Sequence, residues 1–485
     1  MSMLPRFALA LLAMTALAAP SAAQTVYVHV GLEGPEGRTS PDGGDLGDEG
    51  GGRGGFSACS VLQIEPDGTL FELVSNAEIL AATGETEAAC EDTALTVAPD
   101  GTIYFAESRS GHILRVSADG VVSVFVEEAD IDTLLGVSHS PEGGMDVGPD
   151  GTLFVADSNC DCIYSVSPDG QTLDLIVTET AIALETGNRD FVEVGRGQDF
   201  ECTGDPVAAL EGGLAVGPDG TVYFTDDGRG CSPGRMDPGS IRGEPTGLDS
   251  LAAVLRAVPD GLGGYTVSIV ADEDDMFADA PSAFPGGFGD CEVNYVELEF
   301  DIDLGSDGFL YVLEGGLAHP APESCQGGRG AGEDPIVADD KLFRIDPDSG
   351  SVSLVVDAAA FGALSGAPDP DNQAELAGGI ATGGSDLFVG DRVRNSQVGN
   401  RGLTDRIHTI FRVSASGGVS VLLSDEDLQA FYGPRYGGAV AMLEGGLDAG
   451  GTPSVLEVPV GGTPWWVLFG ALLGVLGLWA VRRNL

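Results

Sequence analysis

A recurring phrase, the four-strand units around it and a spare strand near the C-terminal end predict an all-β fold, a six-bladed β-propeller. The phrase at Val147–Ser158 reads as a short apolar strand, a Pro-Asp-Gly turn, an alternating strand and an acid. It returns at Val97–Ser108 and Val216–Asp227, and more loosely at Leu304–Gly315 and Ile380–Arg392. Short antiparallel strands in groups of four at such a repeat are typical of propeller blades.

Each unit is expected to supply four strands, bounded by Gly-containing turns. The expected strands are Thr25–Val30, Ser60–Ile64 and Thr69–Val74; Ala94–Ala98, Thr102–Ala106, His112–Ser117 and Val121–Val126; Gly144–Gly148, Thr152–Ala156, Cys162–Ser167 and Thr172–Val177; Gly213–Gly217, Thr221–Thr225, Leu251–Val258 and Tyr265–Val270; Phe300–Leu304, Phe309–Leu313, Lys341–Ile345 and Ser351–Val356; Gly378–Thr382, Asp386–Val389, Ile407–Val413 and Gly418–Leu422.

The first unit lacks its innermost strand, and the C-terminal segment Gly437–Leu443 is a spare strand of that type. Ala439–Met442 follows two glycines, as Leu214–Val216 does. We predict that this strand completes the first blade and closes the ring, because a closed ring leaves no open sheet edge.

Long connections are expected on one face, between the second and third strands or between blades. A ligand or partner is expected at this face, because function concentrates in loops on a rigid scaffold. The long connections are Gly31–Ala58, Thr178–Gly212, Asp227–Ser250, Ala271–Glu299, Glu314–Asp340 and Asp391–Arg406.

The repeat phrase resembles that of NHL repeats and of gluconolactonase-like and strictosidine-synthase-like propellers. The resemblance covers roughly Thr25 to Leu447 and implies six blades. It also implies a possible lactonase activity with a divalent metal held by Glu, Asn and Asp at inner strand ends. Glu142 and Glu211 precede inner strands, and Asp226 or Asp391 could add a ligand, but no Asn stands in the family's Asn-Gly context.

Both ends of the chain indicate export. Residues 1–23 read as a signal peptide, with Arg6, an apolar stretch and Ser21-Ala22-Ala23. After a propeller over 24–447 and a linker over 448–464, residues 465–481 are expected to form a transmembrane helix. The basic tail 482–485 is expected in the cytoplasm and the propeller outside it. This layout resembles the PEP-CTERM sorting tails of bacterial surface proteins, without their Pro-Glu-Pro motif.

The charge balance is strongly acidic, with 76 Asp and Glu against 22 Lys and Arg. Nucleic acid is excluded as a partner, because its binding depends on basic groups. Such a surface suits a saline environment, divalent cations or basic partners.

An acid ends the second strand of five units, and a ring would place these acids around one mouth of the channel. Two interpretations stay open: oxygen ligands for Ca²⁺ or another divalent metal, or hydrogen bonds from each acid to its neighbouring loop. The acids are Glu107, Asp157, Asp226, Glu314 and Asp391. No other cofactor is indicated.

Nucleophilic catalysis has little support in the sequence. The five histidines are scattered, and no Gly-x-Ser-x-Gly elbow is present. His29 and His139 could face the channel mouth, although a lone histidine is more often structural.

Eight cysteines in an exported chain indicate disulfides. One of the possible connectivities pairs Cys59 with Cys90, Cys160 with Cys162, Cys202 with Cys231, and Cys291 with Cys325.

The function that these observations favour is an exported, envelope-anchored, monomeric binding module. Its loop-rich acidic face would take a protein, glycan or small ligand, with Ca²⁺ assisting. The alternative is a metal-dependent, lactonase-like hydrolase.

Overall fold

The computed structural model divides the chain into two compact units, Met1–Gly451 and Thr452–Leu485. All residues that it describes belong to the first unit. They are 24–32, 58–86, 88, 94–140, 144–193, 200–210, 212–228, 251–279, 298, 301–314, 341–365, 379–384, 386–393, 407–414, 417–432 and 440–450.

Six antiparallel sheets of four strands form the six blades of a β-propeller, which confirms the predicted fold class. Blade 1 has the order β26 (Val440–Gly450), β1 (Thr25–Leu32), β2 (Ala58–Ile64), β3 (Leu70–Val74). Blades 2 and 3 are β4 (Leu95–Val97), β5 (Ile103–Glu107), β6 (His112–Val116), β7 (Val122–Val126) and β8 (Met145–Val147), β9 (Leu153–Asp157), β10 (Cys162–Val166), β11 (Leu173–Val177). Blades 4 and 5 are β14 (Leu214–Val216), β15 (Val222–Asp226), β16 (Ala253–Pro259), β17 (Tyr265–Asp272) and β18 (Ile302–Leu304), β19 (Leu310–Glu314), β20 (Lys341–Ile345), β21 (Val352–Asp357). Blade 6 is β22 (Ile380–Gly383), β23 (Asp386–Val393), β24 (Ile407–Ser414), β25 (Val419–Leu423).

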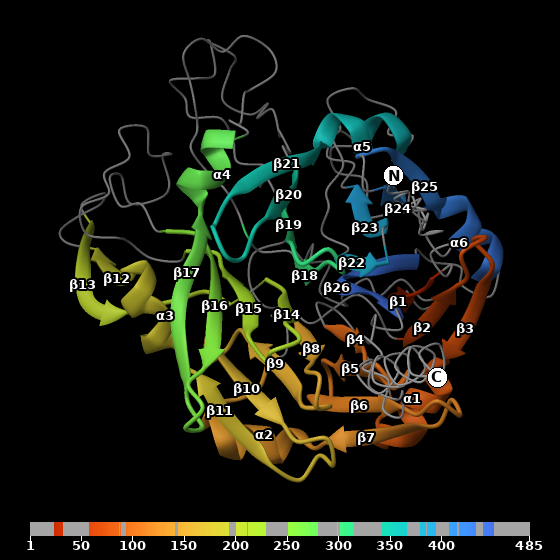
Figure 1. The fold of residues 1–485 in the computed structure, drawn as a ribbon. Coiled ribbons are helices and arrows are strands. Elements are labelled where there is room, and N and C mark those ends of the chain that lie inside the picture. The colour runs from red at the N-terminus through yellow and green to blue at the C-terminus, as the bar shows by residue number, and fades with distance from the viewer. Residues whose placement is uncertain are drawn as a thin grey trace, which may run out of the picture. The chain divides into compact units, whose positions relative to one another are not determined.

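The first strand of each sheet lies innermost, and these six strands follow one another around a closed ring. Their contacts run from β26 to β4, β8, β14, β18 and β22, and return from β22 to β26. Figure 1 shows the propeller viewed down the axis of this ring, with the inner strands around its centre. A two-stranded hairpin, β12 (Arg189–Glu193) and β13 (Phe200–Pro206), is inserted between blades 3 and 4.

The Pro-Asp-Gly phrase forms the tight turn between the first and second strands. In blade 3, Gly151 N donates to Gly148 O at 2.9 Å, and Thr152 N donates to a carboxylate oxygen of Asp150 at 3.0 Å. Gly151 has φ +85°, a left-handed conformation that a side chain disfavours. The phrase is therefore scaffold, as its turn chemistry predicts.

The closing strand β26 pairs with β1, which confirms the closure but corrects its register. Val28 pairs with Leu447 on one side and with Leu62 on the other. In blade 4, Phe224 pairs in the same way with Leu214 and with Leu255. Leu447 therefore corresponds to Leu214, and each of these two leucines follows a Glu-Gly-Gly sequence. The predicted match of Ala439–Met442 to Leu214–Val216 is wrong, because a bulge between Val28 and Val30 lets the strand continue through both segments.

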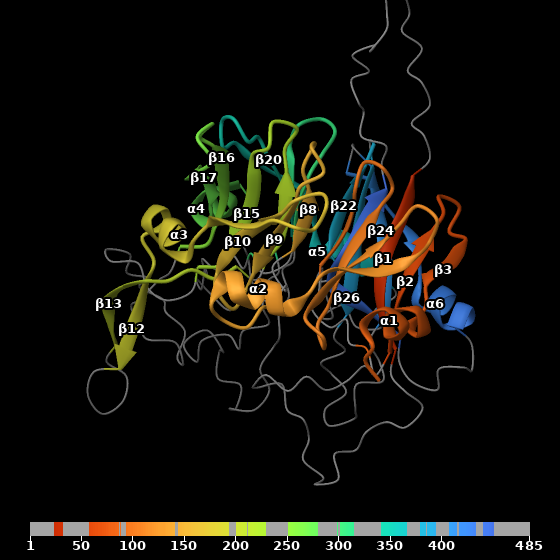
Figure 2. The same cartoon turned by 90° about the horizontal axis from the view of Figure 1, so that it is seen from below.

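Among the described residues, one short helix follows each blade, a feature that the repeat did not predict. Figure 2 shows α1, α2 and α6 along one edge of the ring. The helices are α1 (Asn76–Thr83), α2 (Glu128–Leu135), α3 (Glu179–Thr186), α4 (Glu273–Asp279), α5 (Ala358–Ser365) and α6 (Asp425–Tyr432).

In each of these helices the fourth residue is a completely buried apolar side chain. These anchor residues are Ile79, Ile131, Ile182, Met276, Phe361 and Leu428. Helices α1 to α5 each contact the outermost strand of the next blade, namely β7, β11, β17, β21 and β25. Since a helix of eight residues is marginal alone, we infer that burial of the anchor stabilises each helix and joins two blades.

The core is divided among the interfaces between blades. Each of the six apolar clusters draws side chains from two neighbouring blades. Ile163 of blade 3 and Leu255 of blade 4 share one cluster, and Phe411 of blade 6 packs with Leu313 of blade 5 in another. Packing therefore stabilises the ring order as well as each sheet.

Among the described residues, no helix has the length and apolarity that crossing a membrane requires. The predicted signal peptide at 1–23 and the predicted transmembrane helix at 465–481 lie outside the described residues, so both stay predictions.

The buried anchor of α3 supplies a test of the helix packing. Ile182→Ala is expected to lower the free energy of unfolding by about 2–5 kcal/mol, because it leaves a cavity between blades 3 and 4. Leu184→Ala, two residues on and 67% exposed, is the control and should change it by less than about 0.5 kcal/mol. Denaturant unfolding measures both, and equal losses would contradict the anchor role.

Candidate functional site

The five predicted acids occupy the same register position in their blades. In each blade the first residue of the inner strand pairs with a residue of the second strand, and the acid lies two residues after that partner. The pairs that show this are Leu95 with Phe105, Met145 with Val155, Leu214 with Phe224, Ile302 with Val312, and Ile380 with Val389. Glu107, Asp157, Asp226 and Glu314 are buried, and Val30 holds the matching position of blade 1. The side chain of Asp391 lies outside the described residues.

Glu107 of blade 2 binds the turn that follows it. One carboxylate oxygen accepts from Ser110 N at 2.7 Å and from the Ser110 hydroxyl at 2.5 Å, and the other accepts from Arg109 N at 3.2 Å. A carboxylate that receives several N–H groups is well compensated for its burial. The contacts of Glu107 therefore match the loop-binding alternative.

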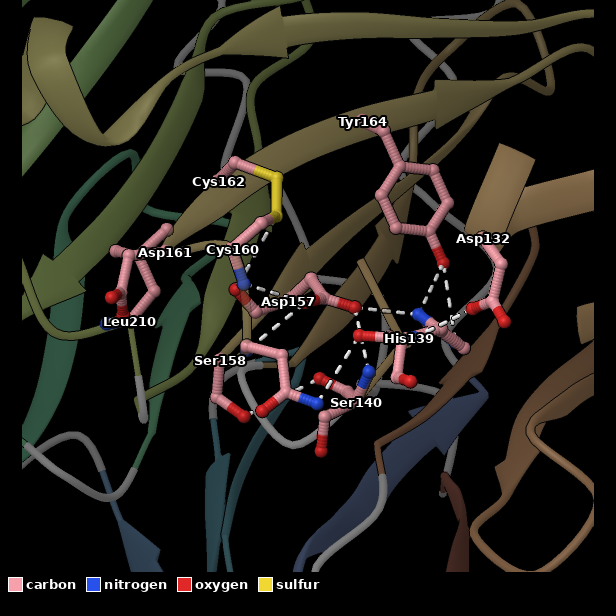
Figure 3. Close-up of a disulfide and its surroundings, with 12 residues drawn as sticks. Asp132, His139, Ser140, Asp157, Ser158, Cys160, Asp161, Cys162, Tyr164 and Leu210 are labelled. Carbon is pink, nitrogen blue, oxygen red and sulfur yellow. Dashed lines mark hydrogen bonds and ion pairs between the residues drawn. A yellow bond between two sulfur atoms is a disulfide. The ribbon is translucent and has the colours of Figure 1, made fainter. Parts of the chain in front are cut away.

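Asp157 of blade 3 binds its own turn and also the segment that arrives from blade 2. One oxygen accepts from Asn159 N and Cys160 N at 3.0 and 3.1 Å, and the other accepts from Ser140 N at 2.8 Å. The second oxygen also lies 2.6 Å from His139 Nδ1 (Figure 3). This carboxylate thus joins two blades.

His139 is buried and contacts Asp157, Tyr164 and Asp132. Its backbone N donates to Asp132 at 2.8 Å, and its Nε2 lies 3.4 Å from the Tyr164 hydroxyl. Burial holds the pKa of Tyr164 well above its usual value. Since the His139 and Asp157 side chains are both 0% exposed, this His–Asp pair has the geometry of an acid–base dyad but not the access that a substrate requires.

Asp226 of blade 4 lies in a more costly environment. Oδ1 accepts from Ala209 N at 2.8 Å and Gly228 N at 3.2 Å, and Oδ2 lies 3.4 Å from Asn188 Nδ2. Loss of hydration on burial outweighs these bonds and raises the pKa of Asp226 to about 7.

Asn188 is the neighbour that a lactonase-like metal site would need, but its amide already pairs with the backbone of Leu251. Its Oδ1 accepts from Leu251 N at 2.8 Å, and its Nδ2 donates to Leu251 O at 3.0 Å. The group that it turns toward Asp226 is therefore an N–H donor, which a metal cannot use.

Glu314 of blade 5 forms an ion pair across the sheet with Lys341, at 3.4 Å, and both side chains are buried. Lys341 is the single lysine of the chain. Removal of one partner from such a pair is costly, so this acid too has a structural use.

The described residues contain no group of three or more His, Cys, Asp and Glu side chains arranged to hold a metal. Glu142 and Glu211 lie outside the described residues, as does the side chain of Asp391. Metal binding by the five acids stays a prediction.

Cys160 and Cys162 form a disulfide in the turn between β9 and β10, with 5.1 Å between their Cα atoms (Figure 3). Cys59 is also disulfide-bonded. The remaining predicted pairings include Cys90, Cys202, Cys231, Cys291 and Cys325, whose side chains lie outside the described residues.

No family model matches the chain, and no curated protein matches it. Among solved structures, a nidogen–laminin complex matches with a TM-score of 0.41 and 9% identity, over 88% of this chain and 98% of that chain. Virginiamycin B lyase from Staphylococcus aureus gives 0.32 and 14%, over 82% and 88%. A gluconolactonase from Xanthomonas campestris gives 0.31 and 14%, over 71% and 81%. Likeness at this level transfers no activity to the chain, whose class, a six-bladed propeller, rests on its own sheets.

The raised pKa of Asp226 predicts a pH-dependent stability. Between its usual pKa of 3.8 and about 7, the folded protein keeps a proton that the unfolded chain has released. The stability contributed by the protonated carboxyl is complete below pH 4 and is lost as the pH rises to about 7. Asp226→Asn should therefore flatten the fall in free energy of unfolding over this window, by up to about 1.4 kcal/mol per pH unit.

Denaturant unfolding at several pH values measures this slope. Asp174→Asn, at an exposed position on β11, is the matched control and should keep the wild-type slope. A wild-type slope in Asp226→Asn would contradict the assignment.

Proposed function

We propose that the protein is an exported propeller, anchored at the cell envelope, that binds a partner through the face where its long loops join. The observation that carries this proposal is that the described acids at the ends of the second strands are engaged by groups of the protein itself. Glu107, Asp157 and Asp226 accept backbone N–H groups of their own or adjoining segments, and Glu314 pairs with Lys341. Acids engaged in this way stabilise the frame, which leaves recognition to the loops that the frame carries.

The lengths of the connections support a binding face that is confined to one arc of the ring. Between the second and third strands, blades 2 and 3 have only residues 108–111 and 158–161. Blades 4, 5, 6 and 1 are consecutive in the ring, and there the same connections span 227–252, 315–340, 394–406 and 33–57. Long connections are tolerated at little cost in stability and are often functional.

The charge of two of these connections indicates the kind of ligand. Acids outnumber arginines in 33–57 and in 315–340. Carboxylates attract divalent cations and basic groups. We therefore propose that the face binds Ca²⁺ and, with it, a protein, glycan or small ligand.

A metal-dependent, lactonase-like hydrolase is the second candidate, and one observation favours it. The carboxyl of Asp226 has a pKa of about 7, and such shifts are common in catalytic acids and bases. Its contacts with Ala209, Gly228 and Asn188 account for the same carboxyl as a structural group, so the binding module is preferred.

Calcium titration tests the preferred function. Added Ca²⁺ is expected to raise the Tm, because a ligand that binds only the folded state stabilises it by about 2.7 kcal/mol at 100 times its Kd. Mg²⁺ serves as the control ion and EDTA should reverse the shift.

The same protein should show no turnover on a panel of lactones with Ca²⁺, Mn²⁺ or Zn²⁺. Turnover abolished by Asp226→Ala would replace the binding module with the hydrolase.

Cell fractionation tests the proposed location. The full chain, expressed in a Gram-negative host, is expected in the membrane fraction, and external protease should digest the propeller once the outer membrane is permeabilised. Deletion of 465–485 should release it from the membrane, because the apolar segment is then lost. Retention of the truncated chain in the membrane fraction would contradict the anchor.

A further inference from the structure

The turn between β9 and β10 contains a disulfide that closes one of the shortest loops possible. A single residue, Asp161, separates Cys160 from Cys162. Because the entropic stabilisation by a disulfide grows with the length of the loop that it closes, this bond contributes less to folding than a disulfide across a long connection. Its position therefore calls for a reason other than loop closure.

Blade 2 shows that the same turn closes without a disulfide. Glu107 pairs with His112 across the turn of blade 2, as Asp157 pairs with Cys162 in blade 3. In both turns the acid accepts the N–H groups of the residues two and three positions on. Ser110 and His112 stand where blade 3 has its two cysteines. The disulfide is thus an addition to a turn that the acid already stabilises.

The disulfide does hold Asp161 between its two cysteines. Among the described residues, Asp161 is the single non-glycine with positive φ, at +46°, and blade 2 has Gly111 at this position with φ +65°. A left-handed conformation is costly for a residue with a side chain. In return, Asp161 Oδ1 accepts from Leu210 N at 3.1 Å, a contact that glycine could not make.

That contact connects the disulfide to the buried carboxyl of blade 4. Leu210 follows Ala209, whose backbone N donates to Asp226 at 2.8 Å. Asp161 also contributes to the raised pKa of Asp226 through its charge. A series of contacts therefore runs from the disulfide through Asp161 and the segment at 209–210 to Asp226.

The two cysteine residues differ in exposure to solvent. Cys160 lies in the turn and is partly exposed, while Cys162 is 3% exposed within β10. Thiol–disulfide exchange begins with attack of a thiolate on the accessible sulfur. Cys160 is thus the sulfur that an incoming thiolate meets first, and Cys162 is the leaving group.

We propose that Cys160–Cys162 is a thiol–disulfide exchange site whose substrates are dithiols, and that its opening releases Leu210 from Asp161. A thiolate of the dithiol bonds to Cys160 Sγ, the Cys160–Cys162 bond breaks, and Cys162 Sγ takes the electron pair and a proton. The second thiol of the substrate then attacks the substrate's own bonded sulfur. The substrate leaves oxidised, as a disulfide, and Cys160 remains as a thiol.

A redox titration of the full-length protein with dithiothreitol tests the exchange site. Alkylation and peptide mass spectrometry then follow each cysteine. Cys160 and Cys162 are expected to be reduced at a dithiol-to-disulfide ratio at least about tenfold lower than Cys59. Reduction of Cys160–Cys162 together with, or after, the Cys59 disulfide would overturn the proposal.

Trapping tests the order of attack. Cys162→Ser leaves Cys160 to form a mixed disulfide with a monothiol disulfide reagent such as cystamine. Cys160→Ser, the matched variant, should react at least about tenfold more slowly at the buried Cys162. Equal rates would contradict Cys160 as the attacked sulfur.

Hydrogen exchange tests the structural consequence. Selective reduction should speed exchange at the Leu210 amide roughly fivefold, the factor that corresponds to the loss of one hydrogen bond. Asp161→Gly, which copies Gly111 of blade 2, should exchange fast at Leu210 before reduction and change no further on reduction. An unchanged exchange rate of the Leu210 amide in the reduced wild-type protein would overturn the proposed release. This measurement on the wild type does not depend on whether any variant folds.

Discussion

The close approach of the inner strands is the constraint on which the rest of the propeller depends. A Cβ atom on Gly144 would lie 2.8 Å from the Cα of Gly213, and one on Gly213 would lie 2.6 Å from Ile302 N. Neither distance is available to a real side chain, so glycine is required where blades 3, 4 and 5 meet. Strand β26 completes this ring from the far end of the chain, since it pairs with β1 and contacts both β22 and β4.

Carboxylates hold neighbouring inner strands together at several of these junctions. Asp146 of blade 3 accepts from Val216 N of blade 4 at 2.6 Å, and Asp301 and Asp303 of blade 5 accept from Ile380 N and Thr382 N of blade 6 at 2.9 and 2.5 Å. Burial raises the pKa of Asp303, although the Thr382 bonds oppose that shift. Part of the acidic composition therefore serves the frame, and net charge alone overstates how many acids face a ligand.

The acids at the ends of the second strands show how one register position acquires different chemistry. Glu107 receives three hydrogen bonds from its own turn, whereas Asp226 receives two N–H groups and a long contact from Asn188. The pKa of Asp226 is raised because those contacts do not replace the hydration that burial removes. Position in the repeat thus fixes where a carboxyl lies, and the neighbouring segments decide what its ionisation costs.

The repeat made the blades, the tight turns and the register of the five acids predictable, since each depends on residues close in sequence. The closure was predictable from the spare inner strand, but its register was not, because β1 and β26 lie far apart in sequence and a bulge shifts their pairing. The helices among the described residues also left a signal, which is an apolar fourth residue such as Ile79, Ile131 or Ile182. In α1, α2 and α3 a glycine follows the helix as well. Their two turns are too short for periodicity to stand out. His139 and Asn188 reach Asp157 and Asp226 from segments between blades, and only the folded chain brings them there.

Because the blades have the same arrangement of strands and turns, a blade that differs at one position can be compared with its neighbours residue by residue. Blade 1 departs by having a buried valine, Val30, where the other blades have an acid. Blade 3 departs in the opposite direction: it keeps the acid-bound turn of blade 2 and adds Cys160, Asp161 and Cys162 to it. The scaffold of the turn does not require these residues. What they add is a reactive sulfur pair and a carboxylate that reaches the next blade, and this is the point of the ring where the frame itself acquires chemistry.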